Sequence, residues 1–273
     1  MALPFAPPAT ADFHMHTDAS DGEHPAAEMA AAAARARLYR WAITDHDTLE
    51  GWRKVRTAPG LVCGVEVTAG DSGREIHIVG LGVDPEHAGL RELLAGIRSI
   101  RMQRVDAILQ RMPSDVRRGL TAEQVKPAEA DAVGRLHLAK ALARCGGVAS
   151  VRDAFQQHLA DEHITDTGLP PFPPIEVVAH AIHAAGGVSI LAHPGAYRSI
   201  LAIAPLTDHL DGIEGAHPGL PDDLQREILE LAQLRGLLVS LGSDTHRISA
   251  TRRPGGVHIE QGLLDPLLDR LRR

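Results

Sequence analysis

The sequence predicts an α/β protein, a single barrel of alternating strands and helices that is interrupted by an inserted helical subdomain. Three observations predict this fold. Strand patterns alternate with helical patterns at both ends of the chain but not in its middle. A length of 273 residues is normal for one α/β barrel. The chain is 44% hydrophobic but only 3% aromatic, which favours a core of aliphatic side chains, typical of helices packed on a parallel sheet.

The first part of the chain alternates between strands and a helix. The helix is rich in alanine and covers residues 25–37, with Pro25 expected at its first position. Around it lie four strand-like segments, at residues 11–16, 40–44, 61–68 and 75–81. This succession predicts parallel strands in βαβ units.

The middle of the chain has no convincing strand. Apolar residues recur at helical spacing over residues 90–112, 133–145 and 151–159. A proline-rich run, Pro170-Pro171-Phe172-Pro173-Pro174, then ends this region. We therefore predict a helical, substrate-capping subdomain over residues 88–169, inserted into a barrel formed by residues 1–87 and 170–273.

Strand and helix patterns resume after the insertion. Helices are expected over residues 175–185, 222–234 and 263–273, and strands over residues 188–192, 212–215 and 237–241. Gly186-Gly187 stands just past the first of these helices, where glycine commonly ends a helix. The chain thus returns to the alternation of its first part, as one interrupted barrel requires.

Charge and composition argue against several classes of function. The net charge of −7 and the pI of about 6.1 disfavour a basic groove for long nucleic acid and binding to an anionic membrane. No segment reaches the ~20 apolar residues of a membrane span, and residues 1–10 lack the features of a signal peptide. Cys63 and Cys145 are expected to be reduced packing residues, which indicates a cytoplasmic protein. A small anionic substrate stays compatible, because bound cations invert the local field. No pattern indicates the oligomeric state.

Metal-type ligands recur at the ends of the predicted strands. In His14-Met15-His16 the two imidazoles share one face of an extended chain, because side chains alternate with a period of two. Further histidines and carboxylates stand at comparable places: His46, Glu66, His77, His193, Asp244 and His246. The C-terminal strand ends of α/β barrels are where their sites are built. The sequence therefore predicts one cluster at one end of the barrel.

The chemistry of these ligands is coherent. Imidazole suits Zn, Mn or Fe, and a carboxylate can bridge two ions. Two ions ~3.5–4 Å apart polarise a phosphoryl oxygen and supply a hydroxide nucleophile, so no serine or cysteine nucleophile is required. Asp45 and Asp47 flank His46 and are interpreted as turn caps outside the cluster.

Each member of the cluster also has a structural interpretation. His77 could be a satisfied core histidine, since it interrupts an apolar strand. His14 and His16 could form a surface pair, and Asp244 and His246 could cap the following turn. The repetition of such residues at equivalent strand ends favours the metal site over these separate explanations.

Six short motifs occur in order along almost the whole chain: Asp12-Phe13-His14-Met15-His16-Thr17, Ser20-Asp21-Gly22, Ile43-Thr44-Asp45-His46-Asp47-Thr48, Gly64-Val65-Glu66-Val67, Leu191-Ala192-His193-Pro194 and Gly242-Ser243-Asp244-Thr245-His246. Together they resemble the polymerase and histidinol phosphatase (PHP) family. The resemblance implies a distorted (β/α)7 barrel that holds two or three divalent metal ions, Mn, Fe or Zn.

The resemblance also implies how the ligands are shared. One ion would take His14, His16, Glu66 and Asp244. A second would share Glu66 and take His77 and His193. A third would take Asp21, His46 and His246, and without it His46 or His246 would act as a catalytic proton donor. Family members with His in place of Asp21 resemble fully trinuclear enzymes, so the third ion is expected to be held more loosely here.

Segments of the middle region resemble one subgroup of this family: Glu75-Ile76-His77-Ile78-Val79-Gly80-Leu81, Gly134-Arg135-Leu136-His137-Leu138-Ala139, Phe155 with Leu159, and His193-Pro194-Gly195-Ala196-Tyr197. The subgroup hydrolyses nucleoside 3′,5′-bisphosphates and, in some members, short RNA from the 5′ end. This resemblance implies that Arg135 and His137 face the substrate, although an exposed helix face would also account for them. Arg198 and Arg247 are further candidates for holding a phosphate. The subgroup's Gly-Lys-x-x-Tyr-Val-Pro-like stretch has no counterpart in residues 161–170, which contain neither Lys nor Tyr, so a different substrate preference is expected.

The leading hypothesis is a metal-dependent phosphoesterase that hydrolyses a phosphate monoester of a small nucleotide. Histidinol-phosphate phosphatase and an exonuclease on short oligonucleotides remain alternatives. A proofreading module acting on long nucleic acid is disfavoured by the acidic charge and by the lack of an attached polymerase segment. A metal-binding regulatory protein without turnover is disfavoured by the complete ligand set.

Overall fold

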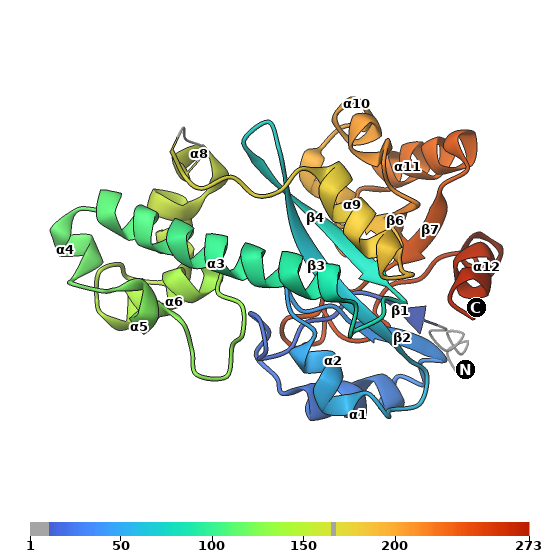
Figure 1. The fold of residues 1–273 in the computed structure, drawn as a ribbon, viewed down its shortest axis with the longest axis horizontal. Helices are drawn as coiled ribbons and strands as arrows, with labels where there is room; N and C mark the ends of the chain where they lie inside the picture. The colour runs from blue at the N-terminus through green and yellow to red at the C-terminus, as the bar shows by residue number, and fades with distance from the viewer. Residues whose placement is uncertain (1–10, 165–167, 273) are drawn as a thin grey trace, which may run out of the picture.

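The computed structural model describes residues 11–164 and 168–272 and contains a nearly closed barrel with helices on its outside (Figure 1). Its seven strands lie in chain order in one sheet: β1 (Ala11–Asp12), β2 (Arg40–Ile43), β3 (Leu61–Asp71), β4 (Arg74–Leu81), β5 (Val188–Leu191), β6 (Gly212–Ala216) and β7 (Leu238–Leu241). The ring approaches closure beyond β1 and β7. There the Phe13 N–H donates to the Leu241 carbonyl (N···O 3.0 Å), and Met15 forms a parallel bridge with Thr245. The α/β barrel predicted from the sequence is confirmed.

One strand departs from the expectation of parallel pairing. β4 is antiparallel to both β3 and β5, whereas the other neighbouring strands pair in parallel. Only Ser72 and Gly73 join β3 to β4, and both have positive φ (49° and 83°), as a type I′ hairpin turn requires. A parallel pair needs a crossover of about a dozen residues or more, which two residues cannot provide. The prediction of parallel strands was therefore wrong for β4. The hairpin places His77, near the start of β4, at the barrel end where the parallel strands finish.

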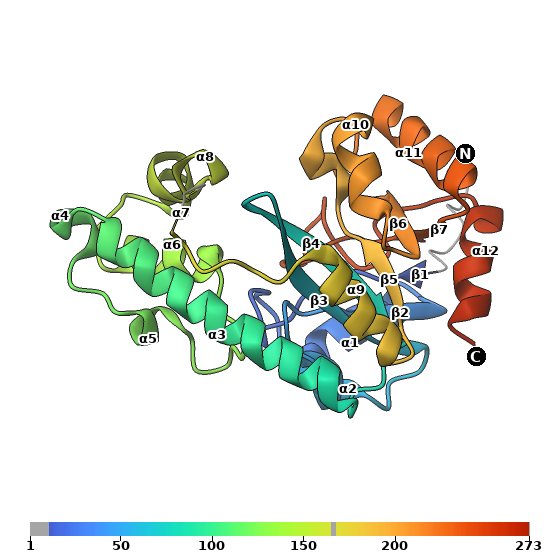
Figure 2. The ribbon, with the colours of Figure 1, turned by 45° about the horizontal axis from the view of Figure 1, so that its top comes forward.

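Helices cover the outside of the barrel (Figures 1 and 2). They are α1 (Ala26–Arg35), α2 (Glu50–Val55), α9 (Ile175–Ala184), α10 (Ile200–Ile203), α11 (Asp222–Arg235) and α12 (Gln261–Arg270), with 3-10 turns at Pro194–Tyr197 and Ala204–Thr207. Pro25 is the N-cap of α1 rather than its first residue. The sequence did not predict α2 and α10, because helices of six and four residues are too short to show a periodic pattern.

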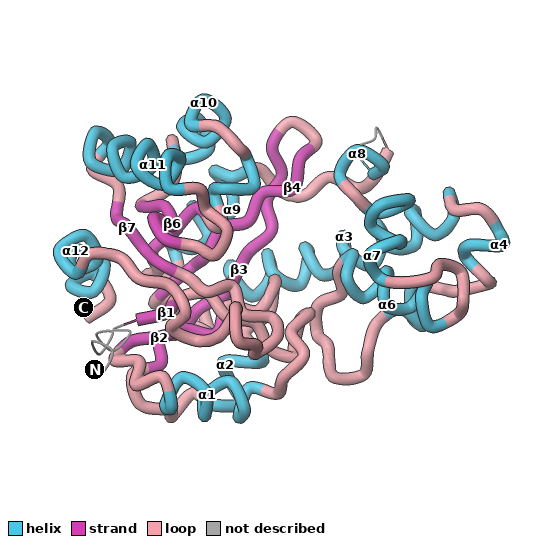
Figure 3. The backbone as a smooth tube through the Cα atoms, turned by 180° about the vertical axis from the view of Figure 1, so that it is seen from behind, coloured by secondary structure: helices cyan, strands magenta, loops and turns pink. Residues whose placement is uncertain are grey.

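A helical insertion extends away from the barrel between β4 and α9 (Figures 1 and 3). Among the described residues its named elements are all helical: α3 (Ala88–Arg111), α4 (Ser114–Arg117), α5 (Ala122–Val125), α6 (Arg135–Arg144), α7 (Val151–Ala154), a π-helical turn (Phe155–Leu159) and α8 (Asp161–Ile164). The three predicted helical segments correspond to α3, α6, and α7 with the π turn. Residues 165–167, which belong to the stretch without Lys or Tyr, lie outside the described residues.

The long helix α3 belongs to two hydrophobic cores. Leu94 and Ile97 in its first half pack in the barrel core together with α9. Val105 and Leu109 in its second half pack in a separate core together with α6. The change from one core to the other occurs around Arg101, which is buried at 7% exposure.

The structure bears on two features expected from the sequence, the lack of membrane spans and the state of the cysteines. None of the helices in the described part of the chain combines the length and the apolar character that crossing a membrane requires. Cys63 and Cys145 are both free, and Cys63 packs against the barrel core. Burial raises the pKa of the Cys63 thiol to about 12, so it stays protonated and unreactive at neutral pH. The prediction of a reduced packing residue is confirmed for Cys63.

Candidate metal centre

Nine side chains from different elements meet at one end of the barrel. They are the residues that the sequence analysis grouped as ligands: His14, His16 and Asp21 after β1, His46 after β2, Glu66 within β3, His77 within β4, His193 after β5, and Asp244 and His246 after β7. Glu66 occupies the centre, since one of its oxygens, Oε2, lies within 3.3 Å of nitrogen atoms of His14, His16 and His46. The structure therefore brings the whole predicted set together.

A first group of donor atoms comes from His14, His16, Glu66 and Asp244. The two histidine Nε2 atoms lie 3.1 Å apart, and each lies 3.2–3.3 Å from Oε2 of Glu66. Oδ1 of Asp244 lies 3.3 Å from the Nε2 atom of His16 and 3.7 Å from that of His14. Donors bonded at 2.0–2.2 Å to one tetrahedral ion are separated by ~3.3–3.6 Å. The donor atoms of His14, His16 and Glu66 are therefore spaced close to the separation of ligands on one ion, and Asp244 lies beside the two histidines.

The other oxygen of Glu66 serves a second group. Oε1 lies 3.1 Å from Nδ1 of His77 and 3.0 Å from Nε2 of His193, and these two nitrogens are 3.1 Å apart. Glu66 thus presents one oxygen to each group, which is the geometry that a carboxylate bridging two ions requires.

Asp21 organises the third group. Its Oδ1 lies 3.1 Å from Nε2 of His246, and its Oδ2 lies 3.7 Å from Nε2 of His46. His16 also takes part, because its Nδ1 is 3.7 Å from Asp21 Oδ1. The donor atoms of these four residues lie within 4.8 Å of one another, so this group is complete but looser than the first two.

Several donor atoms of the cluster lie close together without forming a proper hydrogen bond. Six buried side-chain atoms of the described residues have no partner in hydrogen-bond geometry, and four belong here: His16 Nδ1, Asp21 Oδ1, His46 Nδ1 and Glu66 Oε2, although neighbouring ligand atoms lie as near as 3.0 Å to them. A buried polar atom without a partner is destabilising unless a ligand satisfies it. The mixture of imidazole and carboxylate donors suits Zn, Mn or Fe. The residues present thus fit divalent ions.

The protonation of the cluster also fits a site for divalent ions. Burial alone would raise the pKa of Glu66, but the neighbouring His46, His14 and His77 hold it well below its usual range. Burial would lower the pKa of His77, but Glu66 and Glu75 raise it to about 10. The carboxylates are therefore ionised at neutral pH, and protons on histidine offset part of their charge. Divalent ions would displace those protons, as metal binding to histidine does.

Backbone conformation at the strand ends is strained. His193 has φ 30° and Asp244 has φ 47°, in the left-handed region that disfavours residues other than glycine. His193 also precedes Pro194, which disfavours helical backbone still further. Such strain persists where the surrounding structure enforces it and is common at functional sites. Here the two strained residues place donor atoms in the first and second groups.

The four predicted substrate-binding residues occupy different surroundings. Arg135 is 28% exposed and lies with its Nη2 3.7 Å from Oε2 of Glu75, next to the cluster. His137 is buried at 5% exposure in α6, where Nδ1 accepts a hydrogen bond from the N–H of Gly134. Burial lowers the pKa of His137, while Asp21 and the backbone of Ser20 oppose this effect.

Arg198 and Arg247 lie at the surface. Arg198 is exposed and takes a left-handed conformation at the end of a 3-10 turn. Arg247 is 75% exposed and lies 3.6 Å from Oε2 of Glu23. Asp45 and Asp47, which the sequence analysis excluded from the cluster, bind protein groups instead: Asp45 accepts from Thr17 and Ser20, and Asp47 from Thr68 and Arg101.

Sequence reasoning missed the residues that surround the ligands. Oε1 of Glu214 in β6 lies 2.7 Å from Nδ1 of His14, and its Oε2 accepts from the N–H of His193. Oδ2 of Asp244 faces Nε2 of His217 at 3.4 Å and Nη1 of Arg252 at 3.2 Å. One signal was available: Ala216-His217-Pro218 at the end of β6 repeats Ala192-His193-Pro194 after β5.

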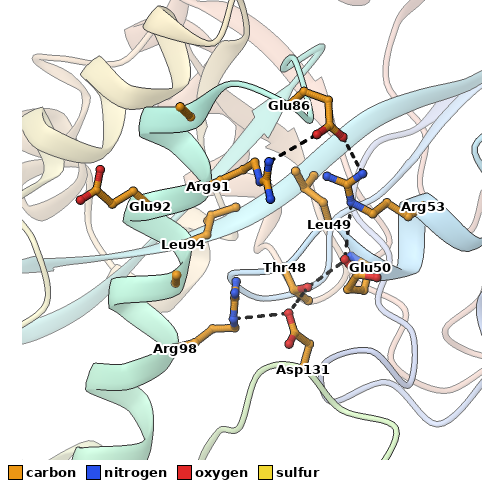
Figure 4. A pocket seen from close by; sticks show the side chains of 12 residues that line it. Thr48, Leu49, Glu50, Arg53, Glu86, Arg91, Glu92, Leu94, Arg98 and Asp131 are labelled. Atoms are coloured by element: carbon orange, nitrogen blue, oxygen red, sulfur yellow. Dashed lines mark hydrogen bonds and ion pairs between the residues drawn. The ribbon is translucent and has the colours of Figure 1, made fainter.

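A cavity of about 380 Å³ opens onto the cluster. Its polar side is lined by ligands of all three groups, and its other side by small and apolar residues: Gly195, Ala196, Pro218, Gly219 and Leu220. A larger cavity of about 600 Å³ lies between α2 and the first half of α3 (Figure 4). Its arginines already pair with carboxylates, as in Arg53–Glu86 and Arg98–Asp131. We assign the functional site to the smaller cavity, because it holds the convergent titratable groups.

The chain is similar to known enzymes that hydrolyse phosphate esters. No family model matches the chain. It is 33% identical over 249 residues to the 5′-3′ exoribonuclease Rnm of Salmonella typhimurium, covering 86% of this chain and 85% of that protein. It is 29% identical over 259 residues to the 3′,5′-nucleoside bisphosphate phosphatase of Chromobacterium violaceum, covering 87% of each. A solved structure from Bifidobacterium adolescentis, described as a candidate metal-dependent phosphoesterase, matches with a TM-score of 0.81 and 28% identity over 97% of this chain and 98% of that chain.

Proposed function

Since the chain belongs to the polymerase and histidinol phosphatase (PHP) family of metal-dependent phosphoesterases, we propose that it removes phosphate from a small nucleotide, in particular a nucleoside 3′,5′-bisphosphate. It is a phosphoric ester hydrolase, as its relatives are. The observation that carries the proposal is Glu66, whose two oxygens each face a separate group of histidines. That arrangement suits a pair of divalent ions beneath the cavity.

The proposed ligands follow the three groups of donor atoms. His14, His16, Glu66 and Asp244 would hold one ion, and Glu66, His77 and His193 a second. Asp21, His46 and His246 would hold a third, more weakly bound ion. We propose Mn, Fe or Zn from the mixed imidazole and carboxylate donors. Bound ions of this kind supply Lewis-acid activation of water and of the phosphoryl oxygens.

The side chains around the cavity supply the remaining chemistry. The described residues that line the cavity include no serine, threonine or cysteine, which supports water as the nucleophile in place of a protein hydroxyl or thiol. The leaving oxygen needs a proton as its bond to phosphorus breaks. If Asp21, His46 and His246 hold no ion, Nε2 of His246 is the better placed donor. Its side chain is 26% exposed against 13% for His46, and both line the cavity.

The origin of the attacking oxygen can be measured in a single turnover in heavy-oxygen water, with enzyme in excess over substrate. One labelled oxygen in the phosphate released in that first turnover supports direct attack by water. Unlabelled phosphate together with a trapped phosphohistidine or phosphoaspartate contradicts it.

The substrate class is supported by the relatives and by the insertion. The C. violaceum relative is named a 3′,5′-nucleoside bisphosphate phosphatase. Arg135 at the start of α6 lies close to Glu75, beside the cluster, where a guanidinium can pair with a second phosphate. We therefore propose that residues 88–169 cap the barrel and that Arg135 and His137 contact the substrate. Arg198 and Arg247 remain further candidates for the second phosphate.

A second candidate is 5′-3′ hydrolysis of short RNA, which the name of the S. typhimurium relative favours. Beside the proposed ligands the cavity is lined by His217 and by small and apolar residues, so it offers few side chains that could select a base by hydrogen bonding. The net charge of −7 still argues against long nucleic acid as a partner. The free Cys63 and Cys145 favour the cytoplasm as the compartment.

A turnover panel separates these activities. Phosphate release and product length are measured with adenosine 3′,5′-bisphosphate, histidinol phosphate, a simple aryl phosphate and a 5′-phosphorylated short oligoribonucleotide. We expect the highest kcat/KM with the bisphosphate. A preference for the oligoribonucleotide would establish the second candidate, and a preference for histidinol phosphate would contradict the proposed substrate class.

A further inference from the structure

A buried arginine of the insertion contacts the strands that carry the candidate ligands. The Nε–H of Arg101 donates to Oδ2 of Asp47 (2.5 Å), and its Nη2 donates to the hydroxyl of Thr68 (2.5 Å). The same Nη2 lies 3.8 Å from Oε1 of Glu75. One guanidinium thus reaches the loop after β2, the middle of β3 and the start of β4.

The contact with Asp47 fixes the loop that carries His46. Asp47 directly follows His46 and has φ 52°, a strained conformation for an aspartate. Its carboxylate also accepts from the N–H and the hydroxyl of Thr68. Arg98, one turn earlier in α3, donates to the Asp47 carbonyl over 2.8 Å. Two arginines of α3 therefore hold both the side chain and the backbone of this residue.

Figure 4 shows how the same loop is held on its other side. Arg98 pairs with Asp131 at 3.3 Å, and Asp131 accepts from the hydroxyl of Thr48 over 2.7 Å. Thr48 and Asp131 both line the cavity between α2 and α3. Within this loop, Asp47 is thus attached to α3 directly, and Thr48 is attached to it through Asp131.

The contact with Glu75 reaches a second histidine. Oε1 of Glu75 lies 3.2 Å from Nε2 of His77, whose other nitrogen faces Glu66. A carboxylate on the outer nitrogen of a ligand histidine fixes both the orientation of the ring and its tautomer. Nη2 of Arg101 lies 3.8 Å from the same Oε1 atom, and Nη2 of Arg135 lies 3.7 Å from the other oxygen, Oε2.

We propose that Arg101 is a positioning residue of the metal centre, which fixes His46 through Asp47 and His77 through Glu75. The insertion is then part of the scaffold of the centre as well as a cap. Arginine suits this role because its planar, permanently charged fork can bind two acceptors in different directions. The inference rests on the metal centre described under the proposed function.

The test compares Arg101→Gln with Arg104→Gln. Arg104 lies one turn further along α3, stacks on Phe172 at 4.6 Å and donates to the Pro170 carbonyl over 2.9 Å. Both proteins are stripped of metal and titrated with Mn²⁺ at a temperature where circular dichroism shows each to be folded. Mutation of a residue that supports metal ligands from behind typically weakens affinity about 10- to 100-fold. For Arg101→Gln we expect this loss of Mn²⁺ affinity at the weaker sites and an unchanged affinity at the tightest site. Arg104→Gln should bind Mn²⁺ as the wild type does.

The experiment measures metal affinity in folded protein. If Arg101 only stabilised the fold, its replacement would leave this affinity unchanged. If Arg101→Gln does not fold, Arg101→Lys keeps the charge while its single ammonium binds only one of the two carboxylates, and the same loss is expected. Wild-type affinity in a folded Arg101 variant would overturn the inference alone. Failure of the wild-type protein to bind Mn²⁺, Zn²⁺ or Fe²⁺ would overturn the metal centre and the inference together.

Discussion

Nδ1 of His14 lies 2.7 Å from Oε1 of Glu214, a carboxylate 200 residues further along the chain. The contact turns Nε2 of His14 towards Glu66 and Asp244. His77 and Glu75 repeat the arrangement on another strand, with 3.2 Å between Nε2 and the carboxylate. Two of the proposed ligand histidines therefore have their outer nitrogen held by a carboxylate, buried in Glu214 and 14% exposed in Glu75.

The first prediction concerns Glu214. Glu214→Gln keeps the size of the side chain but removes the charge that holds His14, so metal affinity should fall by about 10- to 100-fold while the fold is kept. Metal competition with a chromogenic chelator measures this, and Glu227→Gln on the exposed face of α11 is the matched control. Equal affinities for the two variants would remove Glu214 from the centre.

The second prediction concerns Glu66. Because each oxygen faces a different group of histidines, Glu66→Gln removes charge from both proposed sites at once. We expect at least two ions and nearly all activity to be lost, with the circular dichroism spectrum unchanged. Elemental analysis after gentle purification gives the ion count. A variant that keeps both ions and near-normal turnover would refute the bridging role.

The third prediction concerns Arg135. Arg135→Ala should lower kcat/KM for a nucleoside bisphosphate far more than for a simple aryl phosphate, because only the bisphosphate has a second phosphate to pair with a guanidinium. Steady-state kinetics on the two substrates tests this, with Arg144→Ala at the far end of α6 as the control. Equal losses on both substrates would assign Arg135 a structural role through Glu75.

The fourth prediction concerns pH and the metal-free protein. The pKa of His77 is raised to about 10 in the folded state, from an unfolded value near 6.5. The folded state therefore binds more protons between these values, and the contribution of His77 to stability is fully present below pH ~6.5 and is lost as pH rises towards ~10. Urea unfolding across this range should show falling stability for the wild type and a weaker dependence for His77→Gln. Parallel pH profiles for the two proteins would contradict the assignment.

The sequence was informative where one residue type recurs at equivalent positions. Histidines and carboxylates at the strand ends predicted the cluster, and the alternation of patterns predicted the barrel. The direction of β4 was missed because an apolar strand pattern does not encode direction. The two-residue link at Ser72-Gly73 was the available signal.

Some of the surrounding residues could not be predicted, for a physical reason. Glu214 pairs with His14, and a single carboxylate in an apolar strand does not reveal a partner 200 residues away. Glu75 stands only two residues before its partner His77, on the same face of β4, so this pair was open to prediction. Arg101 lies on a helix whose hydrophobic face changes from one core to another, so its burial follows from packing rather than from a motif. His217 was also open to prediction, because it stands after β6 in the same Ala-His-Pro setting as His193 after β5.

The central claim is that the cluster around Glu66 is a divalent metal centre on which phosphate hydrolysis depends. The most direct measurement is phosphate release from adenosine 3′,5′-bisphosphate by protein stripped with a chelator and then titrated with Mn²⁺, Zn²⁺ or Fe²⁺. We predict no measurable release by the stripped protein and recovery that saturates at two or three ions per chain. Undiminished release by metal-free protein, or no response to any of these ions, would contradict the account.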